Sequence, residues 1–436
     1  MKTFYHLLVS AMVVTTKNLF VWFALTYWVY LETHSVVSTG LVGGSFMILS
    51  AFSGFWFGSL VDHHKKKPLL IASNLATLIS FAIAFALYLV VPHEIFTNFN
   101  YVYIWFFAFI LLVGVIAGNI MGIAIPTLVT TLVPEDKRDR ANGMFGTSVG
   151  IAFAITSVAS GIVLGRFGMM WVLVVALILS IAALIHLFFL PLIETKIIHI
   201  HPESGEEMKG PQKIDIKGTI RVVKSIPGLF GLIFFTTFNN FVGGVFMALM
   251  DAYGLSLVTV EQWGTLWGFL SFGFIFGGLY IAKFGLGKKP LKTLFLVNIV
   301  VWSICMVFTL QPSIILLAAG SLIYMSLVPF IEATEQTVIQ KVVPHDRQGR
   351  VFGFAHSVEQ SASPLTAFLI GPITQFIFIP FMTTGAGVDL IGGWFGVGAG
   401  RGIALVITGA GFIGLVVTLL AMRSRSYHLL SKKYAE

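Results

Sequence analysis

Four polar side chains recur at helical spacing inside one long apolar segment, residues 313–343. They are Glu332, Glu335, Gln336 and Gln340. Intervals of three, four and eight place them on one face of a helix. A polar stripe in such a helix should face protein or a water-filled cavity. Glu332 and Glu335 are therefore candidates to load and release a proton or to attract a cationic molecule, with a static hydrogen-bonded network between helices as the alternative.

The next apolar segment, residues 351–380, adds a third acidic side chain. Glu359 lies near His356, Gln360 and Ser363 at helical spacing. It is about eight residues, or roughly 12 Å, from the start of the segment. We predict Glu359 to be part of the same proton or substrate pathway, with a gate or a contact between domains as the alternative.

Lys17 is the corresponding charge near the start of the chain. It lies about ten residues, or roughly 15 Å, inside the apolar segment 7–31. A lysine at that depth in a membrane costs roughly 2.5–3.5 kcal/mol unless it is paired or hydrated. We expect Lys17 to belong to the substrate or proton pathway with Asn18 beside it, while a structural ion pair or a lysine reaching the interface is the alternative. Three further asparagines are candidate hydrogen-bonding groups for the same cavity: Asn119, Asn239 and Asn240.

These residues belong to a chain too apolar for a soluble protein of this size. It is 57% hydrophobic and only 11% charged, which exceeds what one soluble core can bury. Each membrane crossing requires about 20 apolar residues as a helix, because lipid offers backbone amides no partner. The pattern predicts an all-α integral membrane protein with twelve transmembrane helices. The predicted spans are 7–31, 36–61, 68–91, 101–133, 142–165, 168–190, 226–250, 261–283, 290–310, 313–343, 351–380 and 401–422.

The net charge of +8 follows the predicted topology instead of forming a nucleic-acid surface. Nearly all lysines and arginines fall in segments on one side of the membrane; Lys17, Arg166 and Arg401 are the exceptions. The positive-inside rule places that side and both termini in the cytoplasm. We expect a multi-pass protein of the plasma (inner) membrane with no nucleic-acid partner. The longest outer connection is predicted over residues 381–400.

Two short sequences recur about half a chain apart. Gly54-Phe-Trp-Phe-Gly-Ser-Leu60 returns as Gly273-Phe-Ile-Phe-Gly-Gly-Leu279, and Val133-Pro-Glu-Asp returns as Val343-Pro-His-Asp. Such repetition predicts two six-helix bundles of the same orientation, typical of secondary transporters. The predicted domains are residues 1–190 and 226–436, joined by a charged cytoplasmic linker, 191–225.

The loop between the second and third spans carries the motif Gly58-x-Leu60-x-Asp62-His-His-Lys-Lys66-Lys67. It resembles the cytoplasmic loop signature of the major facilitator superfamily. The Val-Pro-x-Asp-(Lys/Arg) loops after the fourth and tenth spans resemble the drug:proton antiporter branch, which includes macrolide-efflux and siderophore-export proteins. His63 replaces the arginine usual after the aspartate, and the second repeat has no aspartate matching Asp62.

The resemblance implies that Asp62 is a gating residue. It would lie near the start of the eleventh helix when the cytoplasmic side is closed, where free backbone amides stabilise an anion by about 0.3–1 kcal/mol at exposed sites. Arg140 and Arg350 occupy equivalent places in the two repeats and could make matching charge contacts. Solvated loop charges are the alternative for both arginines.

The sequence therefore predicts a secondary active transporter for proton-coupled efflux of hydrophobic or cationic small molecules, multidrug- or macrolide-like, by alternating access. The alternatives are an importer or uniporter on the same scaffold, and a transport-inactive membrane partner or sensor. We find no nucleophile–base cluster, ATP-binding signature or metal-ligand cluster, and so expect no enzyme activity, cofactor or metal. The expected energy source is the proton gradient. The expected partners are a small-molecule substrate and membrane lipid, with the protein a monomer.

Overall fold

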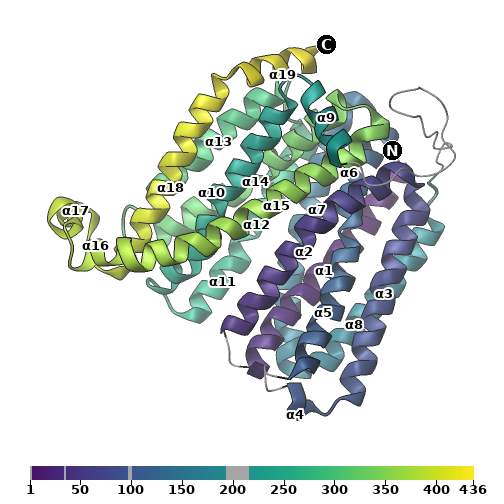
Figure 1. Cartoon of the computed structure of the whole chain (residues 1–436), viewed down its shortest axis with the longest axis horizontal. Helices are drawn as coiled ribbons and strands as arrows, with labels where there is room; N and C mark the ends of the chain where they lie inside the picture. Colours follow the sequence, from purple (N-terminus) through teal and green to yellow (C-terminus); the bar gives the residue numbers. More distant parts are fainter. Residues whose placement is uncertain (1, 34–35, 97–100, 193–215) are drawn as a thin grey trace. The chain divides into compact units, whose positions relative to one another are not determined.

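The chain is mostly helical and divides into two compact units (Figure 1). The computed structural model describes residues 2–33, 36–96, 101–192 and 216–436, so residues 193–215 of the predicted linker lie outside the described residues. Unit 1 consists of Met1–Ala141, Ile151–Val222 and Val343–Ser357. Unit 2 consists of Asn142–Gly150, Val223–Val342 and Val358–Glu436. Each unit thus includes a short segment from the other half of the sequence.

The first half of the chain forms helices α1 to α8 and one 3₁₀ turn, η1. Their bounds are α1 (Lys2–Thr33), α2 (Val36–His63), α3 (Lys66–Val90), α4 (His93–Phe96), α5 (Val102–Gly118), α6 (Ile120–Leu132), η1 (Glu135–Lys137), α7 (Arg138–Phe167) and α8 (Met169–Phe189).

Helix α9 (Ile216–Ser225) ends the predicted linker, and the remaining elements follow it. Their bounds are α10 (Leu229–Leu255), α11 (Val260–Leu270), α12 (Phe272–Phe284), α13 (Pro290–Val307), α14 (Ile314–Val342), the 3₁₀ turn η2 (His345–Arg347), α15 (Gln348–Ile373), the π-helical turn η3 (Thr374–Phe378), α16 (Ile379–Thr383), α17 (Gly387–Phe395), α18 (Ala399–Met422) and α19 (Arg425–Ala435).

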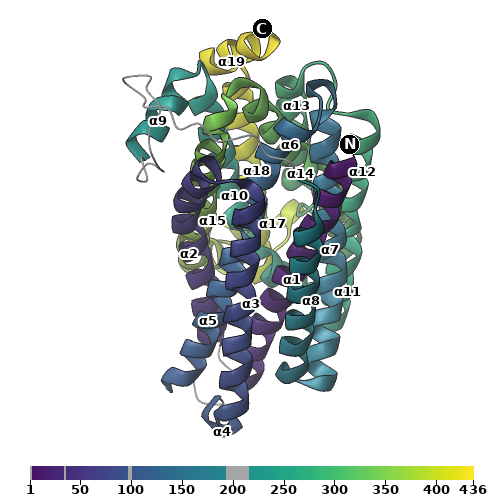
Figure 2. The same cartoon turned by 90° about the vertical axis from the view of Figure 1, so that its right-hand side faces the viewer.

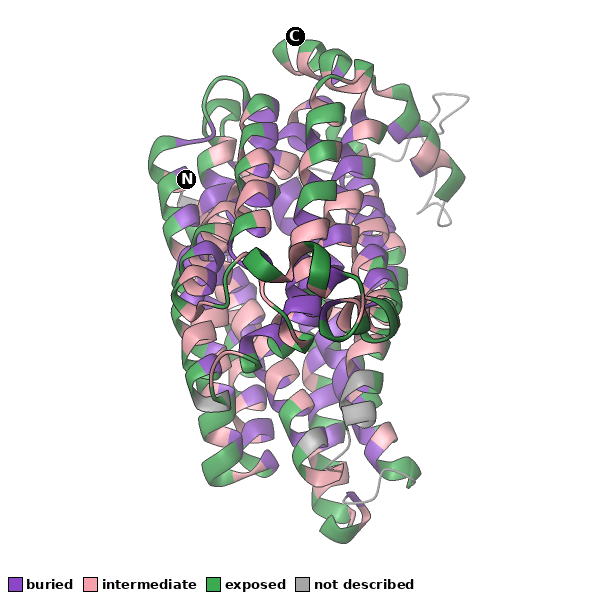
Figure 3. Ribbon diagram, turned by 90° about the vertical axis from the view of Figure 1, so that its left-hand side faces the viewer, coloured by how far each residue is buried: buried purple, intermediate pink, exposed green. Residues whose placement is uncertain are grey.

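Twelve helical spans in the described part of the chain are long and apolar enough to cross a membrane. Three of them contain two α-helices each: α5 and α6 join at Asn119, α11 and α12 join at Ser271, and α15 and α16 join through η3. The twelve spans confirm the predicted helical membrane architecture. Figure 3 shows buried and exposed residues interspersed along the helices. The exposed set includes large apolar side chains such as Phe368 and Phe376, which suit contact with lipid.

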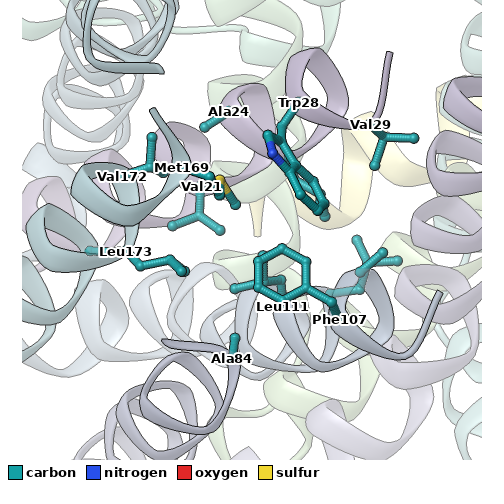
Figure 4. Packing of buried hydrophobic residues seen from close by; sticks show 14 of the residues in the cluster. Val21, Ala24, Trp28, Val29, Ala84, Phe107, Leu111, Met169, Val172 and Leu173 are labelled. Carbon is teal, nitrogen blue, oxygen red and sulfur yellow. The ribbon is translucent and has the colours of Figure 1, made fainter. Parts of the chain in front are cut away.

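The core of unit 1 is formed by α1, α3, α5 and α8 (Figure 4). Trp28 of α1 lies against Phe107 of α5, with ring centroids 4.9 Å apart. Leu173 of α8 and Ala84 of α3 complete the same buried cluster. Because lipid is as apolar as these side chains, close van der Waals contact, more than transfer out of water, holds such helices together.

The two units use the same helix pairings. In unit 1, α3 packs against α5 and α8 (Figure 2). In unit 2, α13 packs against α14 and α18. The third span of each half therefore contacts the fourth and the sixth, as expected of a duplicated bundle.

The predicted outer connection, residues 381–400, contains helix α17 and part of α16. Arg401, at the start of the last predicted span, is buried near the start of α18. Its guanidinium donates to the backbone oxygens of Phe395, Thr309 and Leu310 and to the Tyr253 hydroxyl. Arginine has five N–H donors, so this one side chain can join α18 to α17, to α10 and to the connection between α13 and α14.

We predict that Gly411→Ala destabilises the protein. A Cβ at this position of α18 would lie 2.8 Å from the backbone nitrogen of Met306 and 3.0 Å from the carbonyl carbon of Cys305, in α13. Because backbone atoms cannot turn aside, overpacking should cost about 1–3 kcal/mol of unfolding free energy. Thermal unfolding of the purified protein in detergent measures the effect.

Gly409→Ala is the matched control on the same helix. A Cβ at Gly409 would meet nothing within 4 Å, and alanine favours a helix over glycine by up to about 1 kcal/mol. Its unfolding temperature should equal or exceed that of the wild type. Equal unfolding temperatures for the two variants would contradict the close α13–α18 packing.

Candidate functional site

The structure brings together three glutamates that the sequence analysis selected. Glu332 and Glu335 lie on α14 and Glu359 lies on α15, all within unit 2. The hydroxyl oxygen of Thr236, on α10, is 3.3 Å from Oε1 of Glu335 and 2.5 Å from Oε1 of Glu359. One hydroxyl therefore contacts both carboxyl groups. We call Glu332, Glu335 and Glu359 the acid cluster.

The acid cluster has no counter-charge among the residues that the structure describes. Glu332 is exposed, while Glu335 and Glu359 are half-buried. In the part of the chain that the structure describes, no lysine, arginine or histidine lies within 4.0 Å of the three carboxyl groups. A carboxylate inside a membrane span needs a proton, a cation or several hydrogen bonds. The described residues contain no group of three or more His, Cys, Asp or Glu side chains suited to holding a metal ion.

Two predicted asparagines lie on α10, one turn from Thr236. Asn240 donates from Nδ2 to the Thr236 backbone carbonyl oxygen at 3.1 Å. The backbone carbonyl oxygen of Asn240 accepts from the Ser363 hydroxyl of α15 at 2.8 Å. Asn239 accepts at Oδ1 from the indole nitrogen of Trp302 at 3.1 Å. Its Nδ2 is buried and has no hydrogen-bond partner. These contacts fix α10 against α13 and α15 beside the acid cluster.

Gln340, at the end of the predicted polar stripe, belongs to a separate structural network. It exchanges two hydrogen bonds with Asn142 of α7, at 2.9 and 3.2 Å. Asn142 also donates to the Thr337 hydroxyl at 2.9 Å, and all three side chains are buried. Gln336, between Gln340 and the acid cluster, is half-buried. Neither Asn142 nor Thr236 is conspicuous in the sequence, because a single amide or hydroxyl in an apolar helix usually bonds to its own backbone.

Lys17 is wholly buried within unit 1. Its ammonium nitrogen donates to Asn74 Oδ1 of α3 at 2.8 Å, and the Asn74 amide donates to the Leu70 carbonyl. No carboxylate lies within 4.0 Å of it among the described residues. One acceptor leaves two donors of an ammonium unmatched. Asn18 is also buried, and donates to the Val115 carbonyl at 3.4 Å while its Oδ1 has no partner.

Asn119 occupies the junction between α5 and α6 in unit 1. Its amide donates to the Ser50 hydroxyl of α2 at 3.2 Å. The same hydroxyl lies 3.5 Å from Nε2 of His356, in the part of α15 that belongs to unit 1. Lys17, Asn18 and Asn119 therefore form separate contacts in unit 1.

Asp62, at the end of α2, lies at the N-terminus of α15, also within unit 1. Its Oδ1 accepts from the Gly349 backbone nitrogen at 2.6 Å, and its Oδ2 accepts from the backbone nitrogen and Nε of Arg350 at 2.8 and 3.1 Å. The carboxylate is buried, with 2% of its side chain exposed. Free N–H groups at a helix start make a favourable place for an anion.

Neighbouring residues support this contact. His63 is 2.8 Å from the Ser59 carbonyl through Nδ1, so Nδ1 carries the proton and Nε2 can accept from Arg350 Nη2 at 3.4 Å. A Cβ at Gly58 would lie 2.6 Å from the Gly349 carbonyl oxygen. Glycine at this position therefore allows the backbones of α2 and α15 to approach closely.

The two predicted gating arginines differ. Arg350 contacts Asp62, whereas the side chain of Arg140 is exposed and forms no ion pair within the described ranges. In the second repeat, Ile281 stands where the 219-residue shift places the counterpart of Asp62. A Cβ at Gly143 of α7 would lie 2.6 Å from the Ile281 side chain. The contact between α12 and α7 is therefore apolar where that between α2 and α15 is charged.

Comparison with known proteins agrees with this architecture. Residues 7–367 match the Major Facilitator Superfamily. No curated protein sequence matches the chain. A bacterial homologue of the iron transporter ferroportin, in an outward-facing state, has a TM-score of 0.68 at 13% identity, covering 97% of this chain and 100% of that one.

Two other solved structures are similar. The human organic anion transporter MFSD10 (TETRAN) has a TM-score of 0.62 at 11% identity, covering 95% of this chain and 99% of that one. The proton:xylose symporter XylE has a TM-score of 0.61 at 14% identity, covering 95% of both chains. These likenesses concern the fold. With twelve membrane-spanning helices and a family match over most of its length, the chain belongs to the Major Facilitator Superfamily and is a multi-pass membrane transporter.

Proposed function

We propose that this transporter couples proton entry to the efflux of hydrophobic or cationic small molecules. The observation that carries the proposal is the acid cluster. Three glutamates on two membrane-spanning helices have no basic partner in the described part of the chain. A site of this charge favours either protons or a cation.

Competition between those two ligands provides the coupling. A cationic substrate binds when the carboxylates are ionised, and protons arriving from the other side neutralise them and release it. In this proposal Gln336, Asn239 and Asn240 supply hydrogen bonds around the acid cluster. Lys17, Asn18 and Asn119, each with its own contact in unit 1, supply further polar side chains on the pathway. Alternating access exposes the site to one side of the membrane at a time.

The efflux direction rests on the resemblance of the Val-Pro-x-Asp loops to the drug:proton antiporter branch, and the cationic substrate class rests on the acid cluster. The similar structures include a transporter of organic anions, a homologue of an iron transporter and a symporter of xylose. At 11 to 14% identity they do not select a substrate. The distribution of lysine and arginine supports a plasma-membrane location with both termini in the cytoplasm.

Asp62 is proposed as the latch of this cycle. Its carboxylate joins the end of α2 to the first turn of α15 through two backbone and one side-chain hydrogen bond. Charge-assisted hydrogen bonds of this kind are worth about 1.5–3 kcal/mol each. Opening of the protein on this side would break the contact, so its strength sets the balance between closed and open states.

Glu332→Gln and Glu335→Gln should each slow proton-driven export, and the double variant should abolish it. Losing one ionisable group from the site removes an interaction of about 1.5–3 kcal/mol, or roughly tenfold or more in rate. Proteoliposomes with an imposed pH gradient and a fluorescent lipophilic cation measure this. Glu436→Gln, at the exposed C-terminal residue, is the control. Full activity of the double variant would disprove a role for these two acids.

The orientation of the vesicles separates export from import. In inverted vesicles with an acidic interior, an exporter accumulates the cation, and collapse of the pH gradient stops accumulation. Accumulation confined to right-side-out vesicles would favour an importer instead. Accumulation that persists without the gradient would favour a uniporter.

Asp62→Asn should slow transport more than it weakens substrate binding. The asparagine NH₂ would face one of the two backbone N–H donors of α15, so one charge-assisted hydrogen bond is lost and a donor opposes a donor. We expect a roughly tenfold lower turnover with substrate affinity changed less than about threefold. Asp346→Asn, at an exposed residue of η2, is the matched control. Weakened binding with unchanged turnover would contradict the latch.

A further inference from the structure

The hydroxyl oxygen of Thr236 lies among four other oxygen atoms. Within its own helix it is 3.2 Å from the Leu232 carbonyl and 3.1 Å from the Ile233 carbonyl. From the neighbouring helices it meets Glu335 Oε1 at 3.3 Å and Glu359 Oε1 at 2.5 Å. A threonine hydroxyl has one proton to donate, and this side chain is buried. If both glutamates were ionised, all four neighbours would be acceptors competing for that one proton.

The closeness of the two carboxyl groups also indicates that one of them carries a proton. Glu335 and Glu359 each place Oε1 within 3.3 Å of the same Thr236 hydroxyl oxygen, so their carboxyl groups share one site. Two carboxylates that share a site cannot both ionise freely, because like charges repel. Glu332 lies three residues before Glu335 on the same face of α14 and adds further negative charge nearby. Along the described ranges, no basic side chain lies within 4.0 Å of the three glutamates.

We propose that Thr236, Glu335 and Glu359 form one proton-sharing triad, in which Thr236 is a positioning residue. With one proton on the pair, the protonated carboxyl and the hydroxyl each donate once, so the three groups can be satisfied together. When that proton leaves, two carboxylates compete for a single hydroxyl. Proton loss therefore loosens the contact of α10 with α14 and α15.

This inference deepens the proposed proton coupling and rests on it only for its role in transport. The shared proton is a property of the purified protein and needs no substrate. Infrared difference spectroscopy detects it directly, because a protonated carboxylic acid has a carbonyl-stretch band that an ionised carboxylate lacks. The probe is a pH titration of the full chain in detergent or lipid.

The chain offers a matched set of variants for this titration. Thr236→Val removes the hydroxyl with little change in shape, and Thr236→Ser keeps it. Thr237→Val is the control, because the Thr237 hydroxyl donates to the Ile233 carbonyl of its own helix at 2.6 Å. Glu335→Gln and Glu359→Gln assign the band.

The wild type should show a protonated-carboxyl band that disappears in one titration step, and either glutamine variant should remove that step. Thr236→Val should move its midpoint by about one pH unit, a tenfold change in proton affinity, toward higher pH. The reason is that the ionised pair loses its hydroxyl donor. Thr236→Ser and Thr237→Val should titrate like the wild type. Unfolding temperatures identify any variant that is misfolded, and Thr236→Ser then tests the hydroxyl on its own.

Two results would overturn the triad: a band unaffected by both glutamine variants, or a Thr236→Val midpoint equal to that of the wild type. Transport measurements test the proposed function separately. If the titration behaves as expected but wild-type transport ignores the pH gradient, the triad stands and the proposed proton coupling fails.

Discussion

Lipid supplies no hydrogen bonds and no counter-ions, so every polar group inside the membrane must be satisfied by the protein, a proton or a ligand. Most polar side chains of this chain meet that requirement internally. Arg401 is matched by carbonyl oxygens and a hydroxyl, and Gln340 by an amide. The acid cluster is different, because its negative charges meet a single hydroxyl and no cation among the described residues. This lack of a counter-charge is the reason the acid cluster carries the proposed function.

Lipid also provides no hydrophobic driving force between helices, and this determines how the helices are held together. Packing in lipid depends on close contact and a few hydrogen bonds. Glycine lets α2 approach α15 and lets α18 approach α13. Where the two repeats diverge, they do so in chemistry more than in geometry: Asp62 seals one contact with charge, and Ile281 fills the equivalent place with an alkyl side chain. A duplicated scaffold has thus kept its packing while its two halves have acquired different energetics.

Composition and hydropathy were sufficient to predict the fold, because crossing a bilayer imposes a length and a polarity that few other requirements share. The repeated glycine and Val-Pro motifs predicted the duplication. The glutamates were found because a charge in an apolar helix is costly and so conspicuous. Thr236 and Asn142 were missed since neither is costly by itself, and their partners lie about 100 and 200 residues away. The helical character of residues 387–395 and the burial of Arg401 were missed for a related reason. Glycine-rich composition indicates a loop, and only the three-dimensional fold reveals the carbonyl oxygens that receive the guanidinium.

The contact between Asp62 and α15 is more sensitive to substitution at some positions than at others. Two of the three hydrogen bonds that reach this carboxylate come from backbone nitrogens, at residues 349 and 350. At position 350 almost any residue other than proline preserves the backbone donor, but a Cβ at Gly349 would collide with the Asp62 carboxylate and lie 2.9 Å from the Gly58 carbonyl oxygen. Sequence drift at position 350 would therefore remove one interaction of three, whereas drift at position 62 removes all of them. Related chains should therefore keep the acid at position 62 and the glycine at position 349, while position 350 varies more freely.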